Sequence, residues 1–201
     1  MKKIFLYLLI IVSPAVNAQN VDIDLLKDFD TPATSTGKVG FFKDLSSSSY
    51  IISVAAPVSI FSAGVLKKDK NLRYRSYQMA AGLGFSMGLT YLLKHTINRP
   101  RPYETYPFIV PKIKETSSSF PSGHTTAAFE TATSLSLNFP KWYVIVPAYA
   151  WAGAVGYSRM YLGVHYPSDI AASMLIGAGS AWLSWKVNQK LQKRKSRLGL
   201  Q

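Results

Sequence analysis

The sequence predicts an all-α protein, a helical bundle of five transmembrane helices after a signal peptide, or of six if that first segment is retained. Two observations lead to this fold class. Of the 201 residues, 48% are apolar and 16% are charged, and the apolar residues gather in segments near the lower limit for crossing a bilayer, roughly 17 residues. Basic residues flank these segments, as they do in the cytoplasmic loops of membrane proteins.

The N-terminal residues have the pattern of a secretory signal peptide. A basic start at residues 1–3, an apolar core at Ile4–Val12 and small residues before the junction predict cleavage after Ala18. An uncleaved first transmembrane helix is the alternative, but Pro14 and the short apolar core favour the signal peptide. In both cases the chain is exported, and the residues that follow are expected at the outer face of a membrane.

Residues 19–49 are polar and rich in turn-forming residues, and we expect them to form a periplasmic N-terminal region. Residues 21–29 are compatible with a short amphipathic helix, and residues 39–45 with a position at an interface. Asp22 and Asp24 belong to an acidic cluster, which we interpret as a solvated face rather than as a pair of metal ligands.

Residues 50–185 form the predicted helical domain. Its third segment is more polar than the others and carries Glu130, for which we expect a buried or interhelical position rather than a catalytic role. The last two segments contain Gly and Ala residues that suit close helix packing, and residues 186–201 are a basic cytoplasmic tail. The predicted helices are Tyr50–Leu66, Tyr77–Leu93, Thr125–Phe139, Trp142–Tyr157 and Ile170–Trp185.

If the predicted helices cross the membrane in alternating directions, the strongly basic loops lie on one side and the other loops on the opposite side. If the domain begins outside, the basic run Lys67–Arg75, the turn at Lys141 and the tail from Lys186 all lie inside, as the positive-inside rule requires. The remaining loops then meet at the outer face. That face collects all the candidates for chemistry, which are Lys94, the loop Arg99–Pro121, His124 and the stretch Ser158–Asp169.

Composition also limits the partners. The net charge of +13 is of a size found in nucleic-acid-binding proteins, but the basic residues abut apolar segments and are not interleaved with exposed aromatic residues. We therefore expect no nucleic acid partner. The chain has no cysteine, which excludes disulfides and thiolate metal sites, and no carboxylate cluster offers a divalent metal a place, so no metal or cofactor is expected.

Five residues of the outer face are suited to binding a phosphate group. Arginine forks grip two phosphate oxygens in one plane, and a lysine adds a point charge. Residues at a helix N-terminus offer free N–H groups, and a glycine there allows close approach of the ligand. The cations are Lys94, Arg101 and Arg159, and the helix start is formed by Ser122 and Gly123.

Two histidines and one aspartate supply groups for phosphoryl transfer. Asp169 lies four residues after His165, so at a helix start it can hold one ring nitrogen while the other attacks phosphorus. His124 is then available to protonate the leaving oxygen. The alternative interpretation is that Asp169 only stabilises the N-terminus of its helix, with Pro167 in the first turn. For His95 we expect a structural role.

These residues resemble the three-part signature of the type 2 phosphatidic acid phosphatase superfamily. The first part is Lys94, six residues and Arg101-Pro102, and the second is Pro121-Ser122-Gly123-His124. The third is Ser158-Arg159, five residues, His165, three residues and Asp169. The superfamily also includes bacterial class A acid phosphatases and vanadium haloperoxidases, and the resemblance covers residues 50–185.

The resemblance implies a helical, metal-independent phosphatase that works through a phosphohistidine. It assigns the nucleophile to His165, its orientation to Asp169 and the general acid to His124. Phosphate binding is implied for Lys94, Arg101, Ser122, Gly123 and Arg159. The register with Lys94 selects Arg101 rather than Arg99, and contact with the rest of the substrate remains open for Arg99.

We therefore expect a membrane-bound phosphatase that hydrolyses a lipid phosphate or pyrophosphate at the periplasmic face of a bacterial inner membrane. A secreted soluble acid phosphatase acting on small phosphomonoesters is the first alternative, supported by the signal peptide and the polar third segment. A haloperoxidase is remote for so short a chain. A non-catalytic membrane binding protein is disfavoured, because binding alone requires neither the His165–Asp169 pair nor a second histidine.

Overall fold

The computed structural model describes residues 22–27 and 36–197, and these residues form helices and loops without a strand. The all-α prediction is therefore confirmed. The predicted signal peptide, residues 1–18, lies outside the described residues. In chain order the helices are α3 (Thr36–Leu66), α4 (Lys70–Ile97), α5 (Pro102–Thr105), α6 (Gly123–Asn138), α7 (Trp142–Tyr161) and α8 (Pro167–Arg197), preceded by a short helical piece at residues 22–27.

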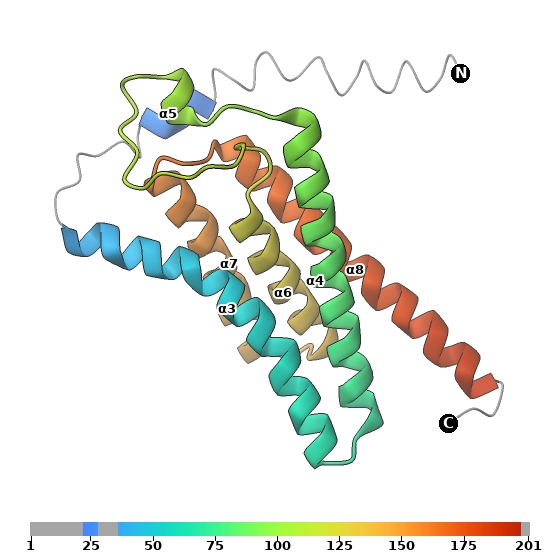
Figure 1. Cartoon of the computed structure of the whole chain (residues 1–201). Helices are drawn as coiled ribbons and strands as arrows, with labels where there is room; N and C mark the ends of the chain where they lie inside the picture. The colour runs from blue at the N-terminus through green and yellow to red at the C-terminus, as the bar shows by residue number, and fades with distance from the viewer. Residues whose placement is uncertain (1–21, 28–35, 198–201) are drawn as a thin grey trace, which may run out of the picture.

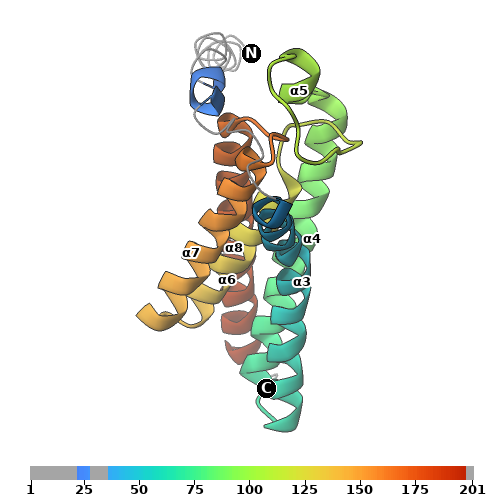
Figure 2. The ribbon, with the colours of Figure 1, turned by 90° about the vertical axis from the view of Figure 1, so that its left-hand side faces the viewer.

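The five long helices lie side by side, with α6 in the middle (Figures 1 and 2). Helix α6 packs against α3, α4, α7 and α8. The end of α4, helix α5, the start of α6 and the junction of α7 with α8 all lie at the upper end of the bundle in Figure 1. The turn from α3 to α4 and the end of α8 lie at the opposite end. The loops with the candidate residues therefore share one end, as the sequence predicted.

Helix α3 begins at Thr36, so the predicted helix start at Tyr50 is corrected to an earlier residue. Residues 36–49 belong to the bundle because their apolar side chains have partners far along the chain. Val39 and Phe42 pack against a buried cluster that contains Leu162 and Val164. Ser46 and Ser49 are buried as well, so one face of this stretch packs on the protein interior while the other stays exposed.

Two further boundaries differ from the prediction. Helix α7 continues through Arg159 to Tyr161, so Ser158–Tyr161 of the expected loop is helical. Helix α8 extends to Arg197, so residues 186–197 prolong the last helix and do not form a separate tail. Lys, Arg, Gln and Leu are strong helix formers, which explains why this polar extension remains helical after the bundle ends.

Large apolar side chains cover the outside of the bundle. Ile51 is 69% exposed, Trp142 76% and Leu175 76%, and they come from three different helices. Such a surface is typical of a protein that faces lipid. Among the described helices, α3 alone is both long and apolar enough to cross a bilayer by itself, with a mean hydropathy of 1.8 over its most apolar part. The number of spans stays a prediction.

The interior between α6 and its neighbours is built from small residues and one buried carboxyl group. A Cβ atom on Gly177 of α8 would lie 2.4 Å from the backbone oxygen of Thr126, so the two helices touch through their backbones. Glu130 is 1% exposed and accepts a 2.8 Å hydrogen bond from Ser134. A Cβ on Gly82 of α4 would meet the Glu130 side chain at 2.5 Å. The interhelical position expected for Glu130 is thus confirmed.

Replacing Gly177 by alanine is expected to destabilise the protein by about 1–3 kcal/mol, because the added methyl group forces α6 and α8 apart. Gly179 is the matched control, since no atom lies within 4 Å of a Cβ built there. In detergent, Gly177→Ala should unfold at a lower temperature than the wild type, whereas Gly179→Ala should unfold at the same or a higher temperature. Equal midpoints for the two variants would contradict this account of the contact.

Candidate functional site

The predicted nucleophile, His165, lies in the connection between α7 and α8 and is 2% exposed. Its Nδ1 atom is 3.5 Å from Oδ2 of Asp169, which occupies the third position of α8. A separation of four residues across a helix start thus places the carboxylate beside the ring, as expected. This arrangement leaves Nε2, on the far side of the ring, as the nitrogen that can meet a substrate.

Asp169 is completely buried and accepts hydrogen bonds on both carboxylate oxygens. The hydroxyl of Ser119 donates to Oδ2 at 2.5 Å, and the backbone N–H of Tyr166 donates to the same oxygen at 3.0 Å. Arg99 donates to Oδ1 at 2.6 Å. The bond from Tyr166 is one half of a capping box at the start of α8. The helix-start contact and the contact with His165 therefore coexist in one side chain.

The environment of His165 keeps its imidazole neutral. Burial is the largest influence, and together with the positive charges of Arg159 and Arg101 it lowers the pKa of His165 to about 3, although Asp169 acts in the opposite direction. A neutral ring carries the lone pair that a nucleophile needs. At neutral pH His165 is consequently in the protonation state that attack on phosphorus requires.

Arg159 projects from the last turn of α7 and is 2% exposed. One terminal nitrogen donates to the Ser46 hydroxyl at 2.8 Å, and the other donates to the Glu115 carboxylate at 2.5 Å. Within the described part of the chain, the buried Nε of Arg159 has no hydrogen-bond partner. A buried cation with an unused donor is well suited to receive an anion.

Arg101 and Lys94 are held by the loop that precedes α6. Arg101 donates from Nε to the backbone oxygen of Ser117 at 2.8 Å and from Nη1 to that of Val164 at 2.7 Å. The Lys94 ammonium donates to the backbone oxygen of Ser118. The bond to Val164 ties Arg101 to the residue that immediately precedes His165, so the first and third parts of the signature meet.

The N-terminus of α6 carries the second part of the signature. The Ser122 hydroxyl accepts from the backbone N–H of Thr125 at 3.4 Å, and the Ser122 backbone N–H donates to Ser173 at 2.7 Å. A Cβ on Gly123 would lie 2.8 Å from the Tyr50 hydroxyl, so only glycine fits without a shift. The His124 ring lies 4.4 Å from the Tyr50 ring, centroid to centroid.

Several residues around the site were not recognised in the sequence. Ser119, Glu115 and Tyr50 each contact a predicted site residue. Arg99 was left free for the substrate, but it binds Asp169 and, at 2.9 Å, Asp22. The solvated position expected for Asp22 is wrong, since Asp22 is 3% exposed. His95 contacts its own helix, with Nδ1 2.8 Å from the Tyr91 carbonyl oxygen, and its structural role stays a prediction.

The geometry defines the class of site. An oriented neutral imidazole, a second histidine at the start of α6 and three cations from the neighbouring helix ends and loop are the groups that metal-free transfer of a phosphoryl group uses. In the described residues, no three His, Asp or Glu side chains converge in the manner of a metal site.

The sequence pattern of the PAP2 superfamily matches residues 76–193, which is more than half of the chain. The protein therefore belongs to the PAP2 superfamily. This match contains all three parts of the signature, and the resemblance stated from the sequence is confirmed.

Related proteins are named phosphatases. An undecaprenyl-diphosphatase of Sulfolobus acidocaldarius is 29% identical over 84% of this chain and 78% of its own length. A lipid A 1-phosphatase of Rhizobium johnstonii is 37% identical, over 50% of this chain and 41% of its own length. The solved structure of a transmembrane PAP2 type phosphatidylglycerolphosphate phosphatase of Bacillus subtilis is 26% identical, with a TM-score of 0.74 over 94% of this chain and 95% of that one. The chain is thus a membrane-associated phosphoric-ester hydrolase.

Proposed function

We propose that the protein hydrolyses a lipid phosphate or pyrophosphate at the periplasmic face of the membrane, without a metal, through a phosphohistidine at His165. The observation that carries the proposal is the buried pair of His165 and Asp169 beside Arg159 and Arg101. The relatives named above act on lipid-linked phosphates, which supports the same substrate class here.

In the first step Nε2 of His165 attacks the phosphorus atom, and the bond to the leaving oxygen breaks. Burial and the charge of Arg159 lower the pKa of His124 to about 3 in the free protein, so His124 takes up its proton when the negative phosphate group binds and raises that pKa. His124 then donates this proton to the leaving oxygen, so the dephosphorylated lipid leaves as an alcohol, or as a monophosphate when the substrate is a pyrophosphate. Water then attacks the phosphohistidine and gives a proton to His124. Inorganic phosphate departs, and both histidines return to their starting states.

The cations act on the charge of the transferring group. Arg159, Arg101 and Lys94 would neutralise the equatorial oxygens in the transition state, and the burial of the two arginines strengthens this effect. Asp169 keeps the proton of His165 on Nδ1 and stabilises the positive ring that forms on phosphorylation. The Ser122 hydroxyl accepts the bond from Thr125 and retains its own hydrogen for a phosphate oxygen.

The charges at the far end of the bundle support a periplasmic site. Lys67, Lys68 and Lys70 lie at the turn between α3 and α4, and Lys141 lies directly before α7. Both turns are at the end opposite to the junction of α7 with α8, which contains His165 (Figure 1). Because basic loops stay in the cytoplasm, the end that carries the site is expected to face the periplasm.

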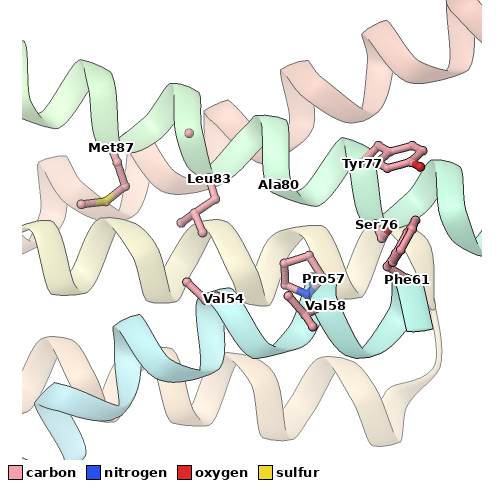
Figure 3. A pocket seen from close by; sticks show the side chains of 10 residues that line it. Val54, Pro57, Val58, Phe61, Ser76, Tyr77, Ala80, Leu83 and Met87 are labelled. Atoms are coloured by element: carbon pink, nitrogen blue, oxygen red, sulfur yellow. The ribbon is translucent and has the colours of Figure 1, made fainter. Parts of the chain in front are cut away.

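An apolar groove between α3 and α4 supports a lipid rather than a small soluble substrate. Its volume is about 460 Å³, and its lining includes Val54, Val58, Phe61, Tyr77, Leu83 and Met87 (Figure 3). The groove comes close to the proposed phosphate site, because a Cβ on Gly123 would lie 3.7 Å from the Met87 side chain. A hydrocarbon chain in this groove would place its headgroup near the start of α6.

The proposal is tested by measuring phosphate release from polyprenyl pyrophosphate, phosphatidate, phosphatidylglycerophosphate, lipid A and a soluble aryl phosphate. Turnover of one or more lipids well above the aryl phosphate supports it. Activity on the aryl phosphate alone, with recovery of the protein in the soluble periplasmic fraction without detergent, would favour a secreted acid phosphatase instead.

Replacing Glu115 by glutamine is expected to tighten the binding of inorganic phosphate roughly 2- to 5-fold, the worth of a partly exposed ion pair. The Glu115 carboxylate lies 2.5 Å from Arg159, where a phosphate oxygen would bind, so the two anions compete. Burial opposes ionisation of Glu115, but the hydrogen bond and the charge of Arg159 outweigh it and lower its pKa. The inhibition constant of phosphate is the measurement. Weaker inhibition in Glu115→Gln than in the wild type would show that Glu115 assists binding.

A further inference from the structure

Residues 22–27 form a short helical piece that lies at the site end of the bundle, near the start of α8 (Figures 1 and 2). Ile23 and Leu26 are 8% and 2% exposed and share a buried cluster with Ile109 and Tyr166. Tyr166 is the residue directly after His165. The piece is therefore docked by apolar contacts against the same connection that carries the proposed nucleophile.

Asp22 completes the start of helix α8 from this remote position. Tyr166, which precedes the first helical residue, has no side-chain oxygen placed to cap the turn that follows it. The backbone N–H of Ser168 donates instead to Asp22 at 2.8 Å, and the Ser168 hydroxyl donates to Asp22 at 2.5 Å. A carboxylate near a helix N-terminus is also favoured by the helix dipole.

Arg99 joins Asp22 to Asp169. One terminal nitrogen donates to Asp22 at 2.9 Å, and the other donates to Asp169 at 2.6 Å. The guanidinium carbon lies 3.8 Å from the centre of the Tyr166 ring, so the plane of the group is fixed as well. A planar fork can bridge two carboxylates while it stacks on a ring, whereas a lysine ammonium cannot.

We propose that Asp22 and Arg99 are positioning residues for His165. Asp22 holds Arg99, Arg99 holds Asp169, and Asp169 holds the imidazole. The N-terminal piece therefore fixes the orientation of the His165 ring, which lies far along the chain. The proposal rests on the proposed function, because it takes His165 as the group that attacks phosphorus. A displacement of about 1 Å at a reacting group can cost a factor of 100 in rate.

The first test compares Asp22→Asn with Asp24→Asn in the full-length protein, with the lipid substrate that the screen identifies. Asp24 belongs to the same piece, but its side chain is 74% exposed and pairs with Lys27, so it is the matched control. We expect kcat to fall about 10- to 100-fold in Asp22→Asn, with KM changed much less, and to stay at the wild-type value in Asp24→Asn. Equal kcat values in the two variants would overturn the proposal.

The second test separates charge from geometry at Arg99. The neutral ring of His165 attacks, so the rate rises as the pH rises through its pKa. Arg99→Met removes the positive charge that pairs with Asp169, so the carboxylate stabilises the protonated form of His165 more strongly. The pKa of His165 then rises, and the acidic limb of the pH profile of kcat moves to higher pH. Arg99→Lys should restore the position of the limb but not the value of kcat. A wild-type kcat in Arg99→Lys, or an unmoved limb in Arg99→Met, would contradict the proposed role.

Two controls keep these outcomes distinct from the failure of the proposed function itself. Turnover in His165→Ala, or no turnover of any lipid by the wild type, would refute the phosphatase mechanism. A wild-type enzyme that requires His165 but is indifferent to Asp22 would refute the positioning role alone. The unfolding temperature in detergent is measured for each variant, and if Asp22→Asn does not fold, the Arg99→Lys result decides.

Discussion

His165→Ala is expected to abolish phosphate release, with a loss of at least about 10⁴-fold in kcat, because the group that forms the covalent intermediate is removed. The substitution removes few other contacts, since one nitrogen of the His165 ring lies near Asp169 and Ser119 and the other is directed away from them. The folded protein should therefore persist while the chemistry stops.

His95→Ala is the matched control, because His95 lies at the same end of the bundle and contacts only its own helix through Tyr91 among the contacts described. Its activity should equal that of the wild type. A rapidly quenched reaction with labelled substrate should also give an acid-labile, alkali-stable phosphoprotein with the wild type and none with His165→Ala. Turnover of substrate by His165→Ala at the wild-type rate would contradict the phosphohistidine mechanism.

The sequence predicted the parts of the fold that depend on local pattern. The five predicted segments all became helices: α3, α4, α7 and α8 carry apolar side chains on the outside of the bundle, whereas the more polar α6 is enclosed by them. Residues 36–49 were not predicted as part of a helix, because their place in α3 depends on contacts with residues far along the chain. Ser46 and Ser49 are buried, and Val39 and Phe42 pack near Leu162, a contact that the local sequence pattern does not indicate.

The contacts of the site also fall into two groups, those that local spacing predicts and those that only the fold reveals. The spacing of His165 and Asp169 predicted their contact, since four residues at a helix start bring two side chains together. The contact of Ser119 with Asp169 spans 50 residues, and that of Asp22 with Ser168 spans 146. Hydroxyls and carboxylates are common on any surface, so their roles became visible only when the fold placed them beside a histidine or an arginine.

Asp169→Asn is the second substitution with a large expected effect, a fall in kcat of the order of 10³ to 10⁴. The carboxylate receives donors from Ser119, Tyr166 and Arg99 and also faces His165. An amide has a single acceptor oxygen and two donor hydrogens, so in either orientation its NH₂ group confronts another donor. The tautomer of His165 is then no longer fixed, and the imidazolium loses its counter-charge.

The same variant decides between the two interpretations of Asp169. If the residue only caps α8, Asp169→Asn should lower stability by about 1–3 kcal/mol, seen as a lower unfolding temperature in detergent, and leave kcat intact. If it orients His165, kcat should fall by the factor stated above, even at temperatures at which the variant is folded. Ser119→Ala, which deletes one donor but keeps the charge, should lose roughly 10-fold in kcat, as expected for one hydrogen bond to a charged group. A loss in Ser119→Ala as large as that in Asp169→Asn would transfer the decisive role from the charge of Asp169 to the hydroxyl of Ser119.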